Sequence, residues 1–138
     1  MNKMIIIIVA LVLILGGGGA AVFFFVLGGE EGPPPPPVIF SPGDFFIVNV
    51  KDSNRLLKTA VLVAVSGERA HRGLPDRLEE DMYVVRDTII FILRELTEDK
   101  IRLMGAEDEV RSMLVAGLNE KFDTDGIVDI LFTEFVIQ

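Results

Sequence analysis

The chain has 138 residues, with 21 Asp or Glu against 13 Lys or Arg, and its net charge at pH 7 is −8. This length leaves room for one folded domain of ordinary size, and the acidic charge excludes nucleic acid as a favourable partner, because phosphate binding depends mainly on Lys and Arg. The chain contains no Cys, which excludes disulfides, thiolate metal sites and Cys nucleophiles.

An uncharged apolar run extends from Met4 to Leu27. Its length of about 24 residues, at ~1.5 Å rise per residue, is enough for a helix to cross a hydrocarbon core of ~30 Å. Lys3 precedes the run, and Glu30 and Glu31 follow it, so the positive-inside rule predicts that residues 1–3 are cytoplasmic. We therefore predict a transmembrane helix over residues 4–27, in a single-pass protein of the cell inner (cytoplasmic) membrane with its C-terminal domain outside the cytoplasm.

Small residues recur at four-residue spacing within this run, at Gly16, Gly17, Ala20 and Ala21. This spacing permits two helices to pack closely in lipid, and the alternative is that these residues have no packing role. Residues 19–21 also fit the cleavage site of a signal peptide, but cleavage there would leave an apolar segment, residues 22–27, at the new N-terminus. A retained anchor is the preferred interpretation.

Residues 28–44 are rich in Gly and Pro and have no apolar periodicity, which predicts a linker. The run from Pro33 to Pro37 favours an extended polyproline spacer roughly 16 Å long. The folded domain is then expected over residues 45–138, held away from the membrane.

Two strands are predicted at the start of this domain, over residues 45–50 and 57–65, because both segments are rich in β-branched and apolar residues. The turn residues Asp52, Ser53 and Asn54 between them favour antiparallel pairing. A third strand is predicted over residues 127–138, in the middle of the sheet. Phe132 and Phe135 are expected on opposite faces of that strand, with at least one of them buried.

Two main helices are predicted between these strands. The first covers residues 78–96, where apolar residues recur at steps of four and three, with Pro75 and Asp76 at its start. A shorter element over residues 97–103 ends before Gly105, and the second main helix covers residues 107–122. The resulting order, β-β-α-α-β, predicts the α+β class, with helices packed on one face of a sheet.

The residues give no support for catalysis, for a metal or cofactor site, or for a small-molecule substrate. The acidic turn from Asp123 to Gly126 lacks the acids that a calcium loop needs at its first and last positions. The single histidine lies in a basic loop with Arg69, His71 and Arg72. These three residues are candidates for contact with an acidic neighbour, and the alternative is a solvated loop.

The chain ends in a predicted strand that contains Phe132, Thr133, Glu134 and Phe135. This ending resembles the C-terminal signature of the flagellar basal body-associated protein FliL family. Further similarity is found in Arg86-Asp87 followed by an apolar helix, in Leu118 to Lys121, and in Phe46 to Val50. The single anchor and variable linker also match the layout of the family.

The resemblance implies a non-enzymatic component of the flagellar basal body that associates with the ion-driven stator. It would support torque, swimming or swarming, and control of rotation in chemotaxis. The resemblance also implies a domain similar to the stomatin (SPFH) fold that assembles with itself into a ring. Two alternatives remain: a membrane-tethered scaffold unrelated to motility, and a secreted enzyme or solute-binding protein, which would require cleavage near Ala21 and a concave pocket.

Overall fold

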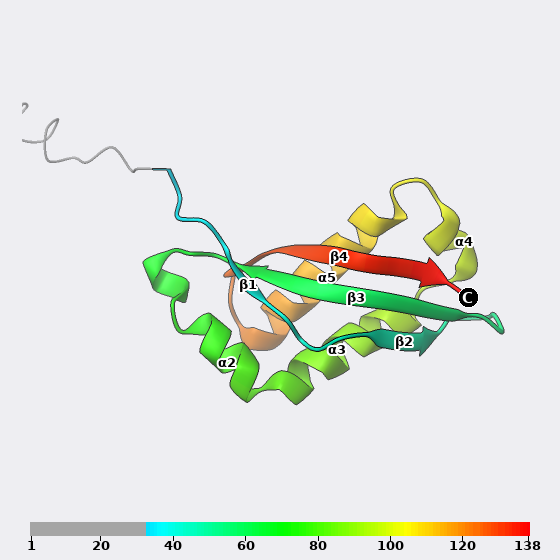
Figure 1. The fold of residues 1–138 in the computed structure, drawn as a ribbon, viewed down its shortest axis with the longest axis horizontal. Coiled ribbons are helices and arrows are strands. Elements are labelled where there is room, and N and C mark those ends of the chain that lie inside the picture. The colour runs from blue at the N-terminus through cyan, green and yellow to red at the C-terminus, as the bar shows by residue number, and fades with distance from the viewer. Residues whose placement is uncertain (1–32) are drawn as a thin grey trace, which may run out of the picture. The chain divides into compact units, whose positions relative to one another are not determined.

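A four-stranded antiparallel sheet and four α-helices make up residues 33–138, the part of the chain that the computed structural model describes (Figure 1). The predicted α+β class is confirmed, and the similarity to the SPFH fold stays a prediction. The strands are β1 (Val38–Phe40), β2 (Phe46–Asn49), β3 (Leu56–Val65) and β4 (Ile127–Ile137). The helices are α2 (Leu74–Glu80), α3 (Met82–Arg94), α4 (Glu98–Arg102) and α5 (Ala106–Phe122), and a 3-10 turn, η1 (Arg69–His71), precedes them.

β3 is the centre of the sheet, and every other strand pairs with it in antiparallel orientation. β4 follows one side of β3, from the pair Leu57 and Ile137 to the pair Val65 and Ile127. β1 and β2 share the other side at opposite ends of β3. The prediction of a central C-terminal strand is therefore wrong, since β4 is an edge strand among the described residues. The apolar composition of β4 reflects the packing of α5 against one of its faces. Composition of this kind does not distinguish an edge strand from a central strand.

β1 lies inside residues 28–44, for which the sequence predicts a linker. Val38 pairs with Val65 and Phe40 pairs with Val63, and the side chain of Phe40 is buried in the core. The expectation of a linker is thus wrong for residues 38–40. A strand of three residues is too short to show an alternating pattern, and it forms because β3 offers a free side there.

The helix predicted over residues 78–96 is in fact two helices. α2 ends at Glu80 and α3 begins at Met82, because Asp81 between them adopts φ −100° and ψ 33°, outside the helical region. Neither Gly nor Pro marks this break, so it follows from tertiary packing and not from local propensity. The predicted apolar stripe still faces the core, and Met82, although partly exposed, packs against it. The buried residues of the stripe are Leu78, Val85, Ile89, Leu93 and Leu96.

The remaining helical region is as predicted. The side chain of Thr97 accepts a hydrogen bond from the backbone N–H of Lys100 at 3.4 Å and caps α4. Gly105, at φ +83°, separates α4 from α5. α5 then turns one stripe toward the sheet, and its buried residues are Ala106, Val110, Leu114, Leu118 and Phe122.

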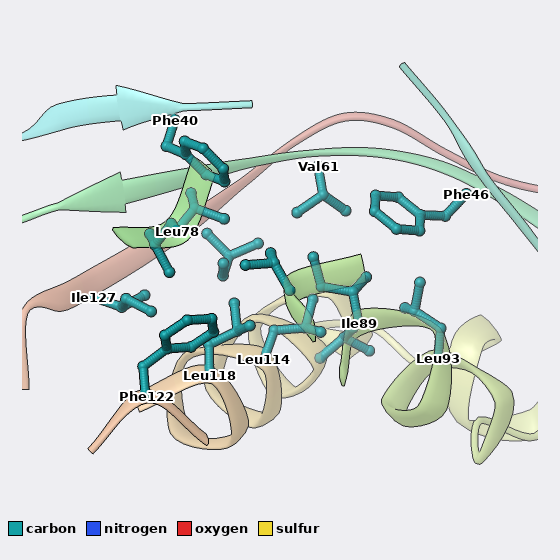
Figure 2. Close-up of a cluster of buried hydrophobic side chains, with 14 of the residues drawn as sticks. Phe40, Phe46, Val61, Leu78, Ile89, Leu93, Leu114, Leu118, Phe122 and Ile127 are labelled. Atoms are coloured by element: carbon teal, nitrogen blue, oxygen red, sulfur yellow. The ribbon is translucent and has the colours of Figure 1, made fainter. Parts of the chain in front are cut away.

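The core fills the space between one face of the sheet and the helices (Figure 2). Val61 of β3 and Phe46 of β2 face the side chains of α3 and α5 across this space. Thr59 is the one polar residue buried among the described core residues, and its hydroxyl donates a hydrogen bond to the carbonyl oxygen of Glu134 at 2.7 Å. The buried hydroxyl is therefore satisfied, and it ties β3 to β4.

Candidate interaction surfaces

The predicted helix-packing residues of the membrane segment, Gly16, Gly17, Ala20 and Ala21, lie outside the described residues. Between residues 33 and 138, none of the helices has the length and apolarity that crossing a membrane requires. The predicted anchor over residues 4–27 therefore stays a prediction.

The basic loop is divided between two roles. Arg69 and Arg72 are exposed, whereas only 15% of the His71 side chain is accessible to solvent. His71 Nε2 lies 2.8 Å from Asp125 Oδ1 in the turn before β4, and this hydrogen bond holds the pKa of Asp125 below its usual value. His71 thus joins η1 to the β4 turn. Only the two arginines are presented to a partner.

The His71–Asp125 pair also resembles part of a catalytic group. A His–Asp pair can serve as an oriented base when the second ring nitrogen reaches a nucleophile. Here His71 Nδ1 is buried and has no hydrogen-bond partner among the described residues, so no hydroxyl is placed to use it. Residues 33–138 also contain no group of three His, Asp or Glu side chains that could hold a metal ion.

The C-terminal signature strand contains a β-bulge. Phe135 lies opposite Thr59, and Phe132 lies opposite Val61, so that Thr133 is an extra residue with no partner on β3. The bulge places both aromatic rings on the helix-covered face, with their centroids 5.1 Å apart. The prediction that they occupy opposite faces is wrong, because simple alternation fails across a bulge. Both rings are partly buried and pack against the core.

Glu134, beside the bulge, points to the opposite face of the sheet. Its carboxylate forms an ion pair with Lys58 Nζ at 2.8 Å, and Lys58 also lies 4.2 Å from the ring centroid of Phe45. Of the four signature residues, only Thr133 is exposed. The signature strand is therefore engaged largely within the domain.

Arg86 holds the loop between β1 and β2 against α3. Its Nη1 donates a hydrogen bond to the carbonyl oxygen of Pro42 at 2.6 Å, and its guanidinium carbon lies 4.5 Å from the ring centroid of Phe46. Pro42 and Phe46 are both buried. A planar, charged group with several donors can make both contacts at once.

Asn119 of α5 fixes the first residue of β4 in a similar way. Its Nδ2 donates to the carbonyl oxygen of Ile127 at 2.8 Å, and its Oδ1 accepts the backbone N–H of Ile127 at 3.0 Å. Ile127 is almost fully buried, at 1% exposure. One side-chain amide thus satisfies both backbone groups of a buried residue.

Comparison with known proteins places Arg86, Asn119 and the signature strand within a region that matches a known family. The sequence profile of the family described as "Flagellar basal body-associated protein FliL" matches residues 39–138, which is most of the chain and nearly all of the folded domain. The chain belongs to the FliL family. The resemblance predicted from the residues is confirmed.

A curated relative is similar over a shorter region. The chain is 27% identical over 93 residues to the flagellar protein FliL of Aquifex aeolicus (strain VF5). This alignment covers 67% of the chain and 56% of the relative. The match therefore spans little more than half of the length of that relative.

The positions that carry the resemblance to the FliL family act mainly inside the domain. Arg86 fixes a loop, Asn119 fixes the start of β4, and Phe132 and Phe135 complete the core beneath β4. These contacts specify the fold and engage the four side chains within the domain. Their neighbours Asp87, Glu120 and Thr133 remain exposed.

One exposed surface was not predicted from the sequence. The face of the sheet opposite the helices exposes Ile39, Ile47, Leu62, Leu131 and Val136 to different degrees, and we call these five residues the outer sheet face. The signal that could have revealed it is on β3, where Ala60, Leu62 and Ala64 replace the polar residues expected on a solvated face.

A second unpredicted feature is the exposed ring of Phe91 on α3. It borders a shallow hollow between α3 and α5, with a volume of about 540 Å³, whose rim carries Asp87, Glu120 and Lys121. The hollow is open, and charges of both signs surround it. It offers no enclosed apolar pocket of the kind that small ligands usually occupy.

Proposed function

We propose that this FliL-family protein is a single-pass component of the flagellar basal body, anchored by residues 4–27, whose domain associates with the motor stator outside the cytoplasm. The observation that carries the proposal is the family match over residues 39–138, because it covers nearly the whole folded unit and not an isolated motif. The placement of Lys3 before the apolar run, and of Glu30 and Glu31 after it, supports the orientation.

The proposed mode of action is contact between proteins. The exposed features of the domain include an apolar sheet face, the ring of Phe91 and the two arginines of the basic loop, and each of these suits a protein surface. In this proposal the domain supports torque, swimming or swarming, and control of rotation in chemotaxis. Self-association into a ring is part of the proposal, because tethering near a membrane raises the effective concentration of weakly interacting domains.

The functional test is an in-frame deletion in the flagellated source organism. We expect slower swimming or lost swarming with flagella still assembled, and restoration by the wild-type gene. A fluorescent fusion should form foci at flagellar bases. Normal motility in the deletion strain, together with a fusion spread evenly over the membrane, would instead indicate a scaffold unrelated to the flagellum.

The orientation is tested with reporter enzymes fused after Gln138. Alkaline phosphatase, which is active only outside the cytoplasm, should be active in the full-length fusion. It should be inactive when residues 1–27 are removed, which is the matched control. An inactive full-length fusion of normal abundance would reverse the proposed orientation.

A further inference from the structure

The side chain of Phe91 projects from α3 and borders two hollows. The first hollow lies between α3 and α5 and has a volume of about 540 Å³. The second lies between the end of α3 and the chain that follows β2, and its volume is about 370 Å³. The ring of Phe91 is 70% exposed, whereas aromatic rings usually gain most from burial. The surface thus consists of an apolar ridge that two recesses share.

Gly117 of α5 forms the floor of the first hollow together with Ile92. A Cβ at Gly117 would lie 2.5 Å from Cδ1 of Ile92, so α3 and α5 approach each other too closely there for a further side chain. Asp87 on α3 and Glu120 on α5 line the rim above this floor. The recess is open to solvent and can admit an apolar side chain of a partner protein.

The two hollows follow each other along α3. On this helix the first hollow is lined by residues between 87 and 92, and the second by residues between 91 and 95. Their centres are therefore roughly one helical turn apart, or about 5–6 Å at ~1.5 Å rise per residue. Two residues at positions i and i+4 of another helix have the same spacing and point in the same direction. A helix packed along α3 would place one apolar side chain in each hollow.

The rim of the first hollow is acidic. It carries Asp87 and Glu120 against Lys121, and within residues 33–138 none of these three side chains forms an ion pair. The two carboxylates are therefore free to meet charged groups of a partner, and Lys or Arg is the complementary type. An Arg there can also stack on Phe91, since Asp87 and Phe91 are one turn apart on α3.

The second hollow has an excess of positive charge. Lys51 Nζ lies 2.6 Å from Glu95 Oε2, and this pair is neutral as a whole. Arg94 also lines the hollow and has no ion-pair partner among the described residues. A partner helix with a basic residue at one end and an acidic residue at the other would match both hollows, and this pattern would fix its direction along α3.

The domain does not itself supply such a helix. Of the large apolar residues exposed on helices within residues 33–138, one is Phe91 and the other is Tyr83, eight positions earlier. A second copy of the described domain therefore offers no exposed apolar pair at four-residue spacing. An extended segment binds mainly through the backbone of a strand edge, whereas this surface is formed mainly by side chains of α3 and α5. The matching occupant is then a helix of a different protein.

We propose that Phe91 and the two hollows, which we call the helix-docking surface, bind an amphipathic helix of a different protein. That helix carries two apolar residues at positions i and i+4, with Lys or Arg beside the first and Asp or Glu beside the second. The proposal rests on the proposed function, in which the domain acts by protein contact, and it assigns a surface and a partner chemistry to that contact.

Synthetic helices test the charge pattern directly. The basic probe is an Ala-rich peptide of about 18 residues, with two Leu four positions apart, two Arg beside the first Leu and one Glu beside the second. The acidic probe has Glu in place of both Arg. Each probe carries a fluorophore, and its anisotropy is measured with the full-length chain in phosphatidylcholine nanodiscs, with empty nanodiscs as the blank. We expect the basic probe to bind roughly tenfold more tightly than the acidic probe, or more.

Charge reversal at the first hollow should exchange this preference. Asp87→Lys combined with Glu120→Lys should weaken binding of the basic probe roughly tenfold or more, and should strengthen binding of the acidic probe. Glu79→Lys combined with Glu80→Lys is the matched control, because it changes the net charge equally at exposed positions of α2. The control should keep the preference for the basic probe. All four positions are exposed, so circular dichroism should show an intact fold.

The apolar ridge is tested separately with Phe91→Ala. This substitution should weaken binding of the basic probe roughly tenfold, because the central apolar contact is lost. Tyr83→Ala is the control, since Tyr83 is 71% exposed on the same helix and lines neither hollow. It should leave the affinity unchanged.

Three results would overturn the proposal: equal or absent binding of the two probes, the same loss of binding in the α2 control as at the first hollow, or unchanged affinity after Phe91→Ala. These outcomes are separate from the motility test. Impaired swimming of the deletion strain without probe binding would reject the helix-docking surface and leave the proposed function intact. The expected probe binding, combined with normal swimming of the deletion strain, would retain the surface and reject the proposed function.

Discussion

The Asn119 amide offers a sharp test of how the domain is held together, because one side chain satisfies two backbone groups of a buried residue. Asn119→Ala removes both hydrogen bonds to Ile127, at 2.8 and 3.0 Å, and leaves its N–H and C=O groups without partners. Ile127 is 1% exposed, so little water can replace the amide. Each unsatisfied buried group costs about 1–3 kcal/mol, and the better helix propensity of Ala returns only about 0.5 kcal/mol.

We therefore expect Asn119→Ala to lower the free energy of unfolding by about 1.5–5.5 kcal/mol, and the melting temperature by roughly 10 °C or more in a domain of this size. The measurement is urea unfolding of the fragment 35–138, followed by circular dichroism. Glu120→Ala is the matched control, because Glu120 is exposed on the same helix. Asn119→Asp should also be destabilised, since it keeps the acceptor and loses the donor.

A loss of less than 1 kcal/mol relative to Glu120→Ala, which is about the size of an ordinary surface effect, would refute this reasoning. It would mean that Ile127 finds other partners, and that Asn119 does not set the start of β4.

Three further predictions concern other contacts. Arg86→Lys should lower the free energy of unfolding by about 1–2 kcal/mol, because an ammonium cannot both stack on Phe46 and donate to the buried carbonyl of Pro42 with the same geometry. Gly67→Ala should detach β1 and speed amide exchange at residues 38–40, since a Cβ there would lie 2.3 Å from the carbonyl oxygen of Pro36. Hydrogen bonds from Arg102 and Ser53 lower the pKa of Glu98 below 4.5, so its stabilisation should be present above pH 4.5 and be lost as the pH falls through the lowered pKa.

Each of these predictions has a control within the chain. Arg94→Lys, at an exposed position of the same helix as Arg86, should be neutral. Gly73→Ala should leave β1 unchanged, because no atom lies within 4 Å of a Cβ at that position. For Glu98, the unfolding free energies of the parent and Glu98→Gln should differ by a constant amount above pH 4.5 and converge at lower pH. If Arg86→Lys or Gly67→Ala has the same effect as its control, the contact assigned to that residue is wrong. For Glu98, a difference in unfolding free energy that grows toward acid pH would contradict the assigned pKa shift.

The sequence by itself determined the features that depend on local pattern. The apolar steps of four and three predicted the core stripe of α3, and the stripe is buried even though the helix is broken at Asp81. Gly105 predicted a helix boundary, because the positive φ that it adopts is a property of a single residue. The order of short motifs also predicted the FliL family.

Only the tertiary structure decided which surfaces are free and which residues are engaged. Arg86 and Asn119 appear in the sequence as polar residues on helices, and their partners lie at Pro42 and Ile127, brought close by the fold. The position of β4 at an edge and the shared face of its two phenylalanines depend on pairing with β3 and on a bulge. These features arise from contacts between distant segments, and the periodicity of one segment carries no information about the register or sides of another. The outer sheet face is free for the same reason, since its exposure depends on where the helices pack.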